Sequence, residues 1–543
     1  MKKQILLLCM ITGSIFTTYA DKTIYVANAS LGTKDGSSAV NACVLNQVFG
    51  TLTPAVALDA TGTTTLTFDA STEYTISSSG SSAYDRACVM IPDNFTKKVI
   101  LEGNNAILKA GSTAVRMFRI GSFTNVELKN LTFKNGTHPA ALGGAIYFAG
   151  DSLKISGCTF DNNSSDNGGA IGSRGKYIKI SNSLFKNNFL IGSFQGGAIS
   201  HTGTTTGGAL IVENSTFSNN IGKAGSNAWG TAIITSFDGT TRNYLNTISI
   251  SNSTFYKNNA GLNTNAGNTA IQLDFLGTTA PAGVVTTATF VNNTFYGNSN
   301  CAIRVWGKQQ AVNLINNVIV GDAWANVSAS GIQDHGIINE FSVAEGRPAL
   351  IAKNNYIVAK YPKSAKNDDA ALATGNTDGN ILITTTAQTD IDALSLTPDL
   401  QTSGSPVPYL GITISSSPLV EGGISSYSGI TIPATDARGI TRGTGTRGSR
   451  FDIGAYEFDG FPVTNLTTVS EDFFSLSQSD GKISIDNTGS KSLVVNVYLT
   501  NGQNIYSANV NKSLTINKNQ LPKGILIFNV NNGLKSVAKK IVL

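Results

Sequence analysis

The sequence predicts an all-β protein in which a long solenoid is followed by a small C-terminal β-sandwich. One short phrase recurs eight times between residues 128 and 357, at intervals that do not fall below about two dozen residues, and such repetition is typical of stacked coils. After about residue 460 the composition changes to short Val- and Ile-rich strands separated by turns. The first observation predicts the solenoid, and the second predicts the sandwich.

Each copy of the phrase has an apolar residue, Asn or Gly two positions later, and a second apolar residue five positions after the first. Residues five apart in a straight strand point to opposite faces, so both are buried only if the strand bends between them. Asn and Gly most readily adopt the left-handed conformations that such a bend needs. We therefore expect stacked Phe rings inside the coils and a structural ladder of Asn amides, formed by Asn130, Asn182, Asn214, Asn252, Asn292, Asn316 and Asn354. A sandwich of unrelated Asn-rich hairpins is the alternative, but it does not require the same bend in every copy.

Two further motifs accompany the phrase. Gly-Gly-Ala-Ile occurs at residues 143–146, 168–171 and 196–199, and Phe-x-x-Asn pairs follow the bends, as in Phe160 with Asn163. Both motifs resemble the repeats of chlamydial polymorphic outer-membrane proteins and, more broadly, the right-handed parallel β-helix of pectate-lyase-like proteins. The resemblance implies how the chain coils and leaves its activity open, because this fold carries lyases, hydrolases and adhesins alike.

The first 20 residues of the sequence predict export from the cytoplasm. Residues 1–20 have two lysines, an apolar run and a Thr-Tyr-Ala end, as in a cleaved secretory signal peptide. Residues 21–62 are expected to form an N-terminal cap, with Cys43 and Cys88 available for a disulfide, and residues 63–360 the β-helix. Without Lys2 and Lys3 the chain has 37 basic and 34 acidic residues, so nucleic acid is not an expected partner.

Residues 361–460 are expected to end the β-helix. The stretches 417–423, 436–442 and 452–457 resemble the choice-of-anchor family Q region that closes bacterial β-helix surface proteins. The resemblance implies that four charged residues form buried ion pairs that lock the last coil, with a catalytic cluster as the alternative. These residues are Asp436, Arg442, Asp452 and Glu457.

Residues 461–543 contain a Val-rich strand, an Asn-Gly turn, a Leu-Pro-x-Gly-Ile strand and a basic last strand. This order resembles the type A C-terminal sorting domain of the Bacteroidetes type IX secretion system, with Gly524-Ile525-Leu526 in place of the usual Gly-Ile-Tyr. The resemblance implies a secreted protein at the cell surface or outer membrane, with the type IX machinery as a partner. An immunoglobulin-like carbohydrate-binding module is the alternative.

The composition of the coils favours binding over catalysis. Tyr256, Tyr296 and Trp306 are the candidate ligand-binding residues, because outward aromatic rings stack on sugars. We therefore expect a monomeric adhesin or glycan-interacting scaffold that recognises an extracellular glycan or a host or cell-surface component, with no cofactor.

A polysaccharide lyase or glycoside hydrolase acting on acidic or plant polysaccharide is the alternative. Its catalytic residues would be Arg304, Asp322, Asp334 and His335, which neighbouring coils would bring near one another if they share a face. A lyase would require Ca²⁺ as well. The acidic clusters that such enzymes use are not repeated on any one face of the predicted coils.

Overall fold

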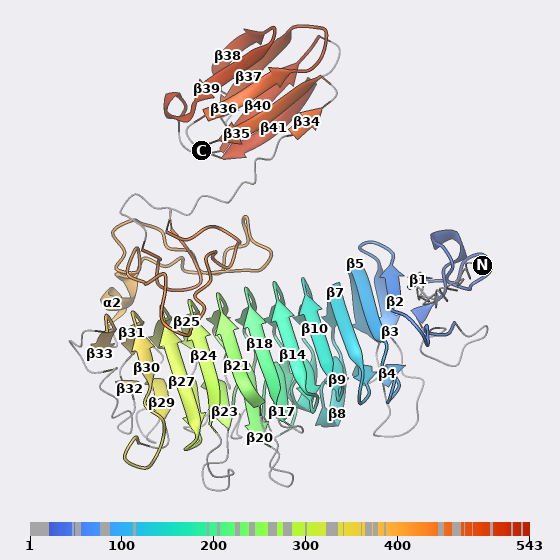
Figure 1. The fold of residues 1–543 in the computed structure, drawn as a ribbon, viewed down its shortest axis with the longest axis vertical. Coiled ribbons are helices and arrows are strands. Elements are labelled where there is room, and N and C mark those ends of the chain that lie inside the picture. Colours follow the sequence, from blue (N-terminus) through green and yellow to red (C-terminus); the bar gives the residue numbers. More distant parts are fainter. Residues whose placement is uncertain are drawn as a thin grey trace, which may run out of the picture. The chain divides into compact units, whose positions relative to one another are not determined.

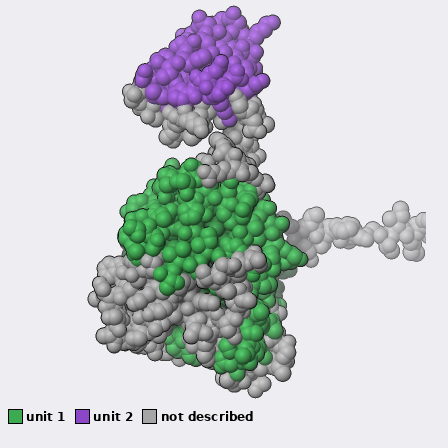
Figure 2. Space-filling view, turned by 90° about the vertical axis from the view of Figure 1, so that its left-hand side faces the viewer, with its two compact units in different colours: residues 1–460 green, residues 461–543 purple. Residues whose placement is uncertain are grey.

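The structure is a computed structural model, and it divides the chain into two compact units, residues 1–460 and residues 461–543 (Figure 2). It describes residues 21–458 except 46–47, 49–55, 77–86, 112–115, 193–194, 204–206, 223–228, 238–244, 259–268, 275–284, 299–300, 322–334, 340–341, 360, 364–371, 373–377, 385–386 and 444–449. It also describes residues 469–542 except 472, 480–481, 500–502, 523–524 and 534–535. The predicted signal peptide lies outside these ranges.

The first unit is a right-handed parallel β-helix, as the sequence predicts (Figure 1). Its first row of parallel strands consists of β1 (Lys22–Val26), β2 (Thr64–Phe68), β5 (Lys98–Ala110), β7 (Asn125–Lys134), β10 (Ser152–Ser156), β14 (Tyr177–Ser181), β18 (Gly208–Glu213), β21 (Leu245–Ser251), β24 (Thr286–Val291), β27 (Gln310–Ile315) and β30 (Ile351–Lys353). The sheet begins at residue 22, before the expected start of the β-helix at residue 63.

A second row follows the bend in each coil and belongs to the same sheet. It consists of β3 (Glu73–Ile76), the second halves of β5 and β7, β11 (Thr159–Asp161), β15 (Leu184–Lys186), β19 (Thr216–Ser218), β22 (Thr254–Tyr256), β25 (Thr294–Asn298), β28 (Val318–Gly321), β31 (Tyr356–Ala359) and β33 (Ile381–Thr384). Because β33 pairs with β31, the sheet continues past the expected end of the β-helix at residue 360.

The return side of the coils is a separate parallel sheet, here called the return sheet. It consists of β4 (Ala87–Ile91), β6 (Arg116–Ile120), β9 (Ile146–Phe148), β13 (Ile171–Ser173), β17 (Ile199–Gly203), β20 (Ile233–Phe237), β23 (Thr269–Asp274), β26 (Cys301–Trp306), β29 (His335–Asn339) and β32 (Tyr361–Lys363). A short third sheet between the second row and the return sheet contains β8 (Thr137–Leu142), β12 (Ser164–Asn167) and β16 (Phe189–Leu190).

The bend and the aromatic stack have the predicted form. The seven bend asparagines all have positive φ, between 48° and 55°. In the eighth copy Gly157 has φ 63°, and a Cβ there would lie 2.3 Å from Asn130 Oδ1, so only glycine fits without displacing its neighbour. Consecutive buried Phe rings stack with centroid separations of 4.6–5.0 Å through Phe133, Phe160, Phe185, Phe217, Phe255 and Phe295.

The predicted ladder of bend asparagines is present only in part, and the continuous ladders lie one residue or a few residues further along the chain. Among the described bend asparagines, side-chain bonds between neighbours join Asn252 to Asn214 and Asn316 to Asn292, each at 3.1 Å. Asn130 is exposed, since the left-handed backbone turns this position to the outside of the coil. Continuous buried ladders instead run along Asn163, Asn188, Asn220, Asn258 and Asn298, and along Asn293, Asn317, Asn355 and Asn380, with amide-to-amide distances of 2.8–3.0 Å.

The chain then turns back and covers one flank of the β-helix. This returning segment, residues 394–458, follows the short helix α2 (Gln388–Asp392) and packs Leu394, Leu419 and Ile453 against outward residues of β28 and β31. Val318 and Val320 on β28 are therefore buried although they point away from the coil interior. The segment lies along the flank of the middle and later coils, and this corrects the expectation that it only locks the last coil.

The second unit is a two-sheet antiparallel sandwich with its own apolar core. One sheet contains β34 (Val469–Glu471), β35 (Phe474–Ser479), β36 (Lys482–Asn487) and β39 (Ser513–Asn517), and the other contains β38 (Asn504–Val510), β37 (Leu493–Leu499), β40 (Ile525–Asn531) and β41 (Ser536–Val542). The described residues also contain the 3₁₀ turns η1 (Ala39–Asn41) in the first unit and η3 (Lys518–Gln520) in the second.

Two smaller expectations concern the cap and the membrane. Cys43 is a buried free thiol whose Sγ donates to the carbonyl of Tyr25 at 3.4 Å, so it does not form the disulfide considered for the cap. The side chain of Cys88 is not among those that the structure describes. None of the helices in the described ranges is long and apolar enough to cross a membrane.

Candidate functional site

Two strands of the return sheet, β23 and β26, and Trp229, which precedes β20, bring two indoles and three polar side chains together on the outer face of this sheet. We call Trp229, Gln272, Asp274, Arg304 and Trp306 the indole cluster. Parallel pairing of β23 with β26 sets Gln272 beside Arg304 and Asp274 beside Trp306. The alternate residues of the same strands, Ile271, Leu273, Ile303 and Val305, are buried in the interior of the coils. Strand alternation therefore directs the polar residues and Trp306 outward.

The guanidinium of Arg304 lies within reach of both indoles, beside the pair. The ring centroids of Trp229 and Trp306 are 6.3 Å apart with an interplanar angle of 25°. The guanidinium carbon of Arg304 lies 4.5 Å from the Trp306 centroid and 5.9 Å from that of Trp229, within the range of cation–π attraction. Arg304 also donates from Nη1 to Gln272 Oε1 at 3.5 Å and is only 7 % exposed. The arginine therefore has a fixed position that keeps the indoles in place.

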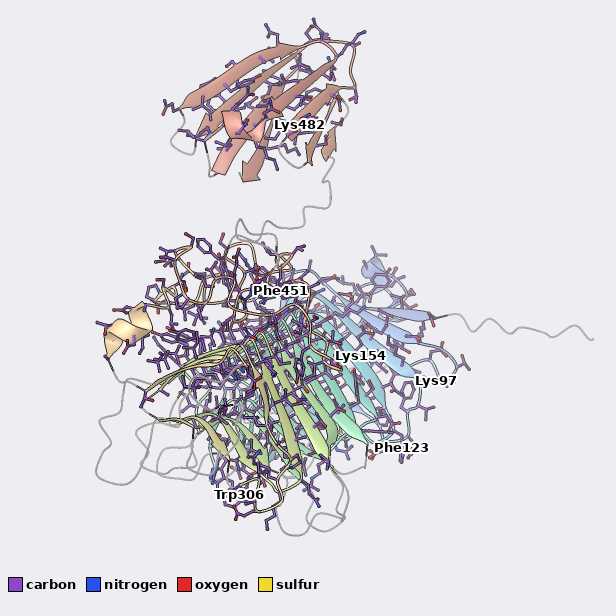
Figure 3. The ribbon with its side chains drawn as sticks, turned by 60° about the vertical axis from the view of Figure 1, so that its left-hand side comes forward. Lys97, Phe123, Lys154, Trp306, Phe451 and Lys482 are labelled. Carbon is purple, nitrogen blue, oxygen red and sulfur yellow. The ribbon has the colours of Figure 1, made fainter. Side chains whose placement is uncertain are left out.

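Trp306 is half-buried and labelled in Figure 3, where it lies on the opposite side of the β-helix from Phe451 of the returning segment. The returning segment therefore does not cover this face of Trp306. A half-buried indole beside fixed polar groups is the arrangement that sugar rings bind by stacking.

Two polar atoms of the cluster have no hydrogen-bond partner in the part of the chain that the structure describes. They are Asp274 Oδ1, an acceptor, and Gln272 Nε2, a donor, and both are buried. Burial raises the pKa of the Asp274 carboxyl to about 6, an effect that the positive charge of Arg304 opposes. Buried polar atoms are usually hydrogen-bonded, so an unpaired donor and an unpaired acceptor two positions apart on β23 make this face a candidate place for a ligand.

The predicted tyrosine platform is on another face and is covered. Tyr256 points outward from β22, as alternation requires, but it is only 4 % exposed. Its hydroxyl donates to Asp399 Oδ1 at 3.0 Å, and Lys257 lies 4.6 Å above its ring. Tyr296, half-buried, stacks on it with a centroid separation of 6.0 Å. The expectation that Tyr256 offers an open ring to a sugar is therefore wrong, because the returning segment occupies its outer side.

Of the four candidate catalytic residues, the structure places two. Arg304 belongs to the indole cluster, while Asp322 and Asp334 lie outside the described residues. His335 begins β29, opposite Cys301 of β26 and three positions along the strand from the register of Arg304. Three positions correspond to about 10 Å along a strand, so the backbone does not bring His335 to Arg304.

The returning segment contains a second cluster of charged residues. The hydrogen bonds of these residues indicate that the cluster has a structural role. Arg442 pairs with Glu457 at 3.1 Å, and Arg438 pairs with Asp436 at 2.5 Å. Arg442 also donates to Asn252 Oδ1 at 3.1 Å, which ties the segment to a bend of the β-helix. Burial lowers the pKa of Arg442, and the charge of Glu457 opposes this shift.

The carboxylates of this second cluster accept backbone N–H groups at nearly every oxygen. Asp452 accepts from Glu421 and Phe458, and Glu457 accepts from Gly443 and from Asp452 itself. Burial raises the pKa of Asp452 to about 6, and the nearby charge of Glu457 raises it as well. Carboxylates that accept backbone N–H groups hold the backbone in place. These hydrogen bonds therefore favour a structural role for the second cluster over the catalytic alternative.

The sequence contains a signal for the indole cluster in the weakened copies of the Gly-Gly-Ala-Ile motif. The weakened repeats Asn268-Thr269-Ala270-Ile271 and Asn300-Cys301-Ala302-Ile303 align Ile271 with Ile303. One position further on, this alignment pairs Gln272 with Arg304, and three positions further on it pairs Asp274 with Trp306. Among the described residues no group of three or more His, Cys, Asp or Glu side chains could hold a metal ion.

Comparison with known proteins concerns the second unit. Residues 479–543 match the family described as secretion system C-terminal sorting domain. A search of curated proteins finds no match to the chain. The antiparallel sandwich is therefore a type IX sorting domain, and the protein is an exported one that interacts with the type IX secretion machinery.

Proposed function

We propose that this protein is a glycan-binding β-helix displayed on the cell surface, an adhesin or scaffold that holds an extracellular glycan at the indole cluster. The observation that carries the proposal is the pair of indoles packed against Arg304, on the strands that hold an unpaired buried donor and an unpaired buried acceptor. Aromatic faces bind the C–H faces of sugar rings, and a few fixed polar groups select their hydroxyls.

The rest of the chain fits display at a surface. The N-terminal 20 residues serve as a signal peptide for the inner membrane, and the sorting domain then directs the chain across the outer membrane. The coils are repeats of the polymorphic outer-membrane type, and residues 417–458 are a choice-of-anchor Q-like end region. Asn252, Asn316 and Asn354 donate hydrogen bonds to backbone carbonyls of this region, which supports a role in stabilising the flank of an extracellular solenoid.

A polysaccharide lyase or glycoside hydrolase is the second candidate, and one observation favours it. Asp274 has a carboxyl pKa raised to about 6 next to Arg304, and raised carboxyl pKa values occur at catalytic acids. Hydrolysis needs a second carboxylate at a suitable distance. Binding is the better-supported function, since Asp274 is the one carboxylate among the described members of the cluster.

The test is affinity electrophoresis of the purified mature chain in gels that contain single polysaccharides, with reducing and unsaturated ends measured in the same samples. Retardation by a polysaccharide without new chain ends is the expected result. Trp306→Ala should weaken binding by about 1 kcal/mol or more, roughly fivefold, through lost stacking. Phe123→Ala is the matched control, because Phe123 is an exposed aromatic residue outside the cluster. Equal retardation of the parent and Trp306→Ala would refute the assigned site, and new chain ends would favour the enzyme.

A further inference from the structure

The polar atoms of the indole cluster select one chemical class of glycan. We infer that the cluster binds a neutral sugar through a pair of hydroxyls, one donating to Asp274 Oδ1 and one accepting from Gln272 Nε2, and that it disfavours uronic acids. This inference rests on the proposed function and narrows its ligand.

The first step is the complementarity of the two unpaired atoms. In the described part of the chain Asp274 Oδ1 lacks a donor and Gln272 Nε2 lacks an acceptor, although Gln272 is only 1 % exposed. The two residues lie two positions apart on β23, so their Cα atoms are about 6.6 Å apart and their side chains leave the same face. A hydroxyl both donates and accepts, so a sugar diol satisfies both atoms at once.

The negative charge of Asp274 disfavours sugars that carry a carboxylate. A uronate carboxylate has only acceptors, so it could bond to Gln272 Nε2 but would repel the Asp274 carboxylate. Arg304 does not reverse this preference, because its guanidinium is held against the face of Trp306 and bonded to Gln272 Oε1. A charged ligand would also have to lose its hydration at this half-buried site, whereas a neutral sugar does not bring a charge that must be desolvated.

The third step is the position of the indoles. Trp306 neighbours Asp274 in the register of β23 and β26, so a ring that stacks on the indole has its edge toward the carboxylate. This is the geometry in which hydroxyls at the ring edge bond while the C–H face stacks. The Gln272 amide is fixed in turn by its bond to Arg304, which aims Nε2 away from the guanidinium.

The experiment is calorimetric titration of the full mature chain with neutral hexasaccharides of glucose, xylose, mannose and galactose, and with hexagalacturonate and hexamannuronate. We expect at least one neutral oligosaccharide to bind at least tenfold more tightly than either uronate. Asp274→Asn should weaken that binding about tenfold or more and raise the relative affinity for uronates, since the repulsion is gone. Gln272→Leu, which removes the donor, provides a second variant, and Asp151→Asn, an exposed carboxylate in another turn, is the control.

The outcomes distinguish a failure of the inference from a failure of the proposed function. Tighter binding of a uronate than of any neutral sugar to the parent overturns the inference and leaves the proposed function intact. Neutral-sugar affinity that is unchanged in both Asp274→Asn and Gln272→Leu also overturns it. Absence of binding to all six oligosaccharides and to the polysaccharide gels removes the proposed function itself. Melting curves of the variants show whether a loss of affinity reflects a loss of fold.

Discussion

Replacement of Asn220 by Leu tests the interior amide ladder. Asn220 Oδ1 accepts from the backbone N–H of Asn188 at 3.1 Å and from Asn188 Nδ2 at 2.9 Å. Its Nδ2 donates to the Phe185 carbonyl at 2.9 Å and to Asn258 Oδ1 at 2.8 Å. Leucine has a similar size and removes all four bonds, so the substitution breaks the ladder at its centre without opening a large cavity.

The loss of stability in Asn220→Leu depends on which neighbouring groups keep a second hydrogen-bond partner. Asn188 Nδ2 still donates to the Phe160 carbonyl, and Asn258 Oδ1 still accepts the backbone N–H at position 220. The backbone N–H of Asn188 loses its acceptor in a buried site, which costs about 1–3 kcal/mol, and the other lost bonds cost about 0.5–1.5 kcal/mol each. We predict a loss of about 2.5 to 7.5 kcal/mol in the free energy of unfolding of the β-helix.

Denaturant unfolding, followed by circular dichroism, measures the total loss, and hydrogen exchange resolved by peptide shows whether the coils around residue 188 lose protection first. Asn313→Leu is the control, because Asn313 is half-buried and donates a single side-chain bond to Thr289 Oγ1 at 3.0 Å. It should cost no more than about 1 kcal/mol. If the two substitutions cost the same, the ladder does not stabilise the coils in the way described.

Three further predictions use the core, the returning segment and the sorting domain. Phe217→Ala should cost about 3 to 5 kcal/mol, seen as a lower unfolding midpoint, because the ring is fully buried between its stacked neighbours; an unchanged midpoint would contradict the stack. The pKa of Asp452 is raised from 3.8 to about 6, so its contribution to stability is full below about pH 4 and lost as the pH rises to about 6. Asp452→Asn should flatten the stability profile between these values, and a profile as steep as that of the parent would refute this assignment. A chain that ends after Gly460 should fold but remain in the periplasm, as measured by cell fractionation, because the first unit has its own core and the second is the sorting domain; its arrival at the surface would contradict the sorting role.

The periodic part of the fold was predictable from the sequence. The bend phrase marked residues with positive φ, and the Phe positions gave the stack, because both features depend on local backbone geometry repeated in every coil. The position of the amide ladder was not obtained, since the phrase does not show which of two adjacent polar residues turns inward. Asn316 and Asn317 illustrate this: the first forms the bend, and the second enters the buried ladder.

The returning segment was harder to predict because its contacts are long-range and not periodic. Thr216 donates to the carbonyl of Pro408, and Asn252 contacts Thr435, so no repeat relates the partners. A signal was nevertheless present in β28, where Val318-Ile319-Val320 is continuously apolar. Such a run is typical of a strand buried on both faces, whereas the alternation in Thr159-Phe160-Asp161 of β11 indicates one open face.

The candidate site was predictable only in part. Arg304 and Trp306 were predicted from their residue types, but Asp274 was not, because its place beside Trp306 depends on the register of β23 and β26. Tyr256 was wrongly expected to be open, because strand alternation gives the direction of a side chain and not what covers it. Alignment of coils through their buried Ile residues recovers the correct neighbours.

Intrinsic tryptophan fluorescence tests glycan binding at the indole cluster most directly, because the chain has three tryptophans and two of them, Trp229 and Trp306, form the cluster. Titration of the mature chain with the tightest-binding neutral oligosaccharide should give a saturable change in emission and protect the indoles from iodide quenching. In Trp306→Ala the change should be lost or need at least about fivefold more ligand. Saturable binding of the oligosaccharide with unchanged emission and unchanged quenching would place the ligand elsewhere and contradict the proposed function of this site.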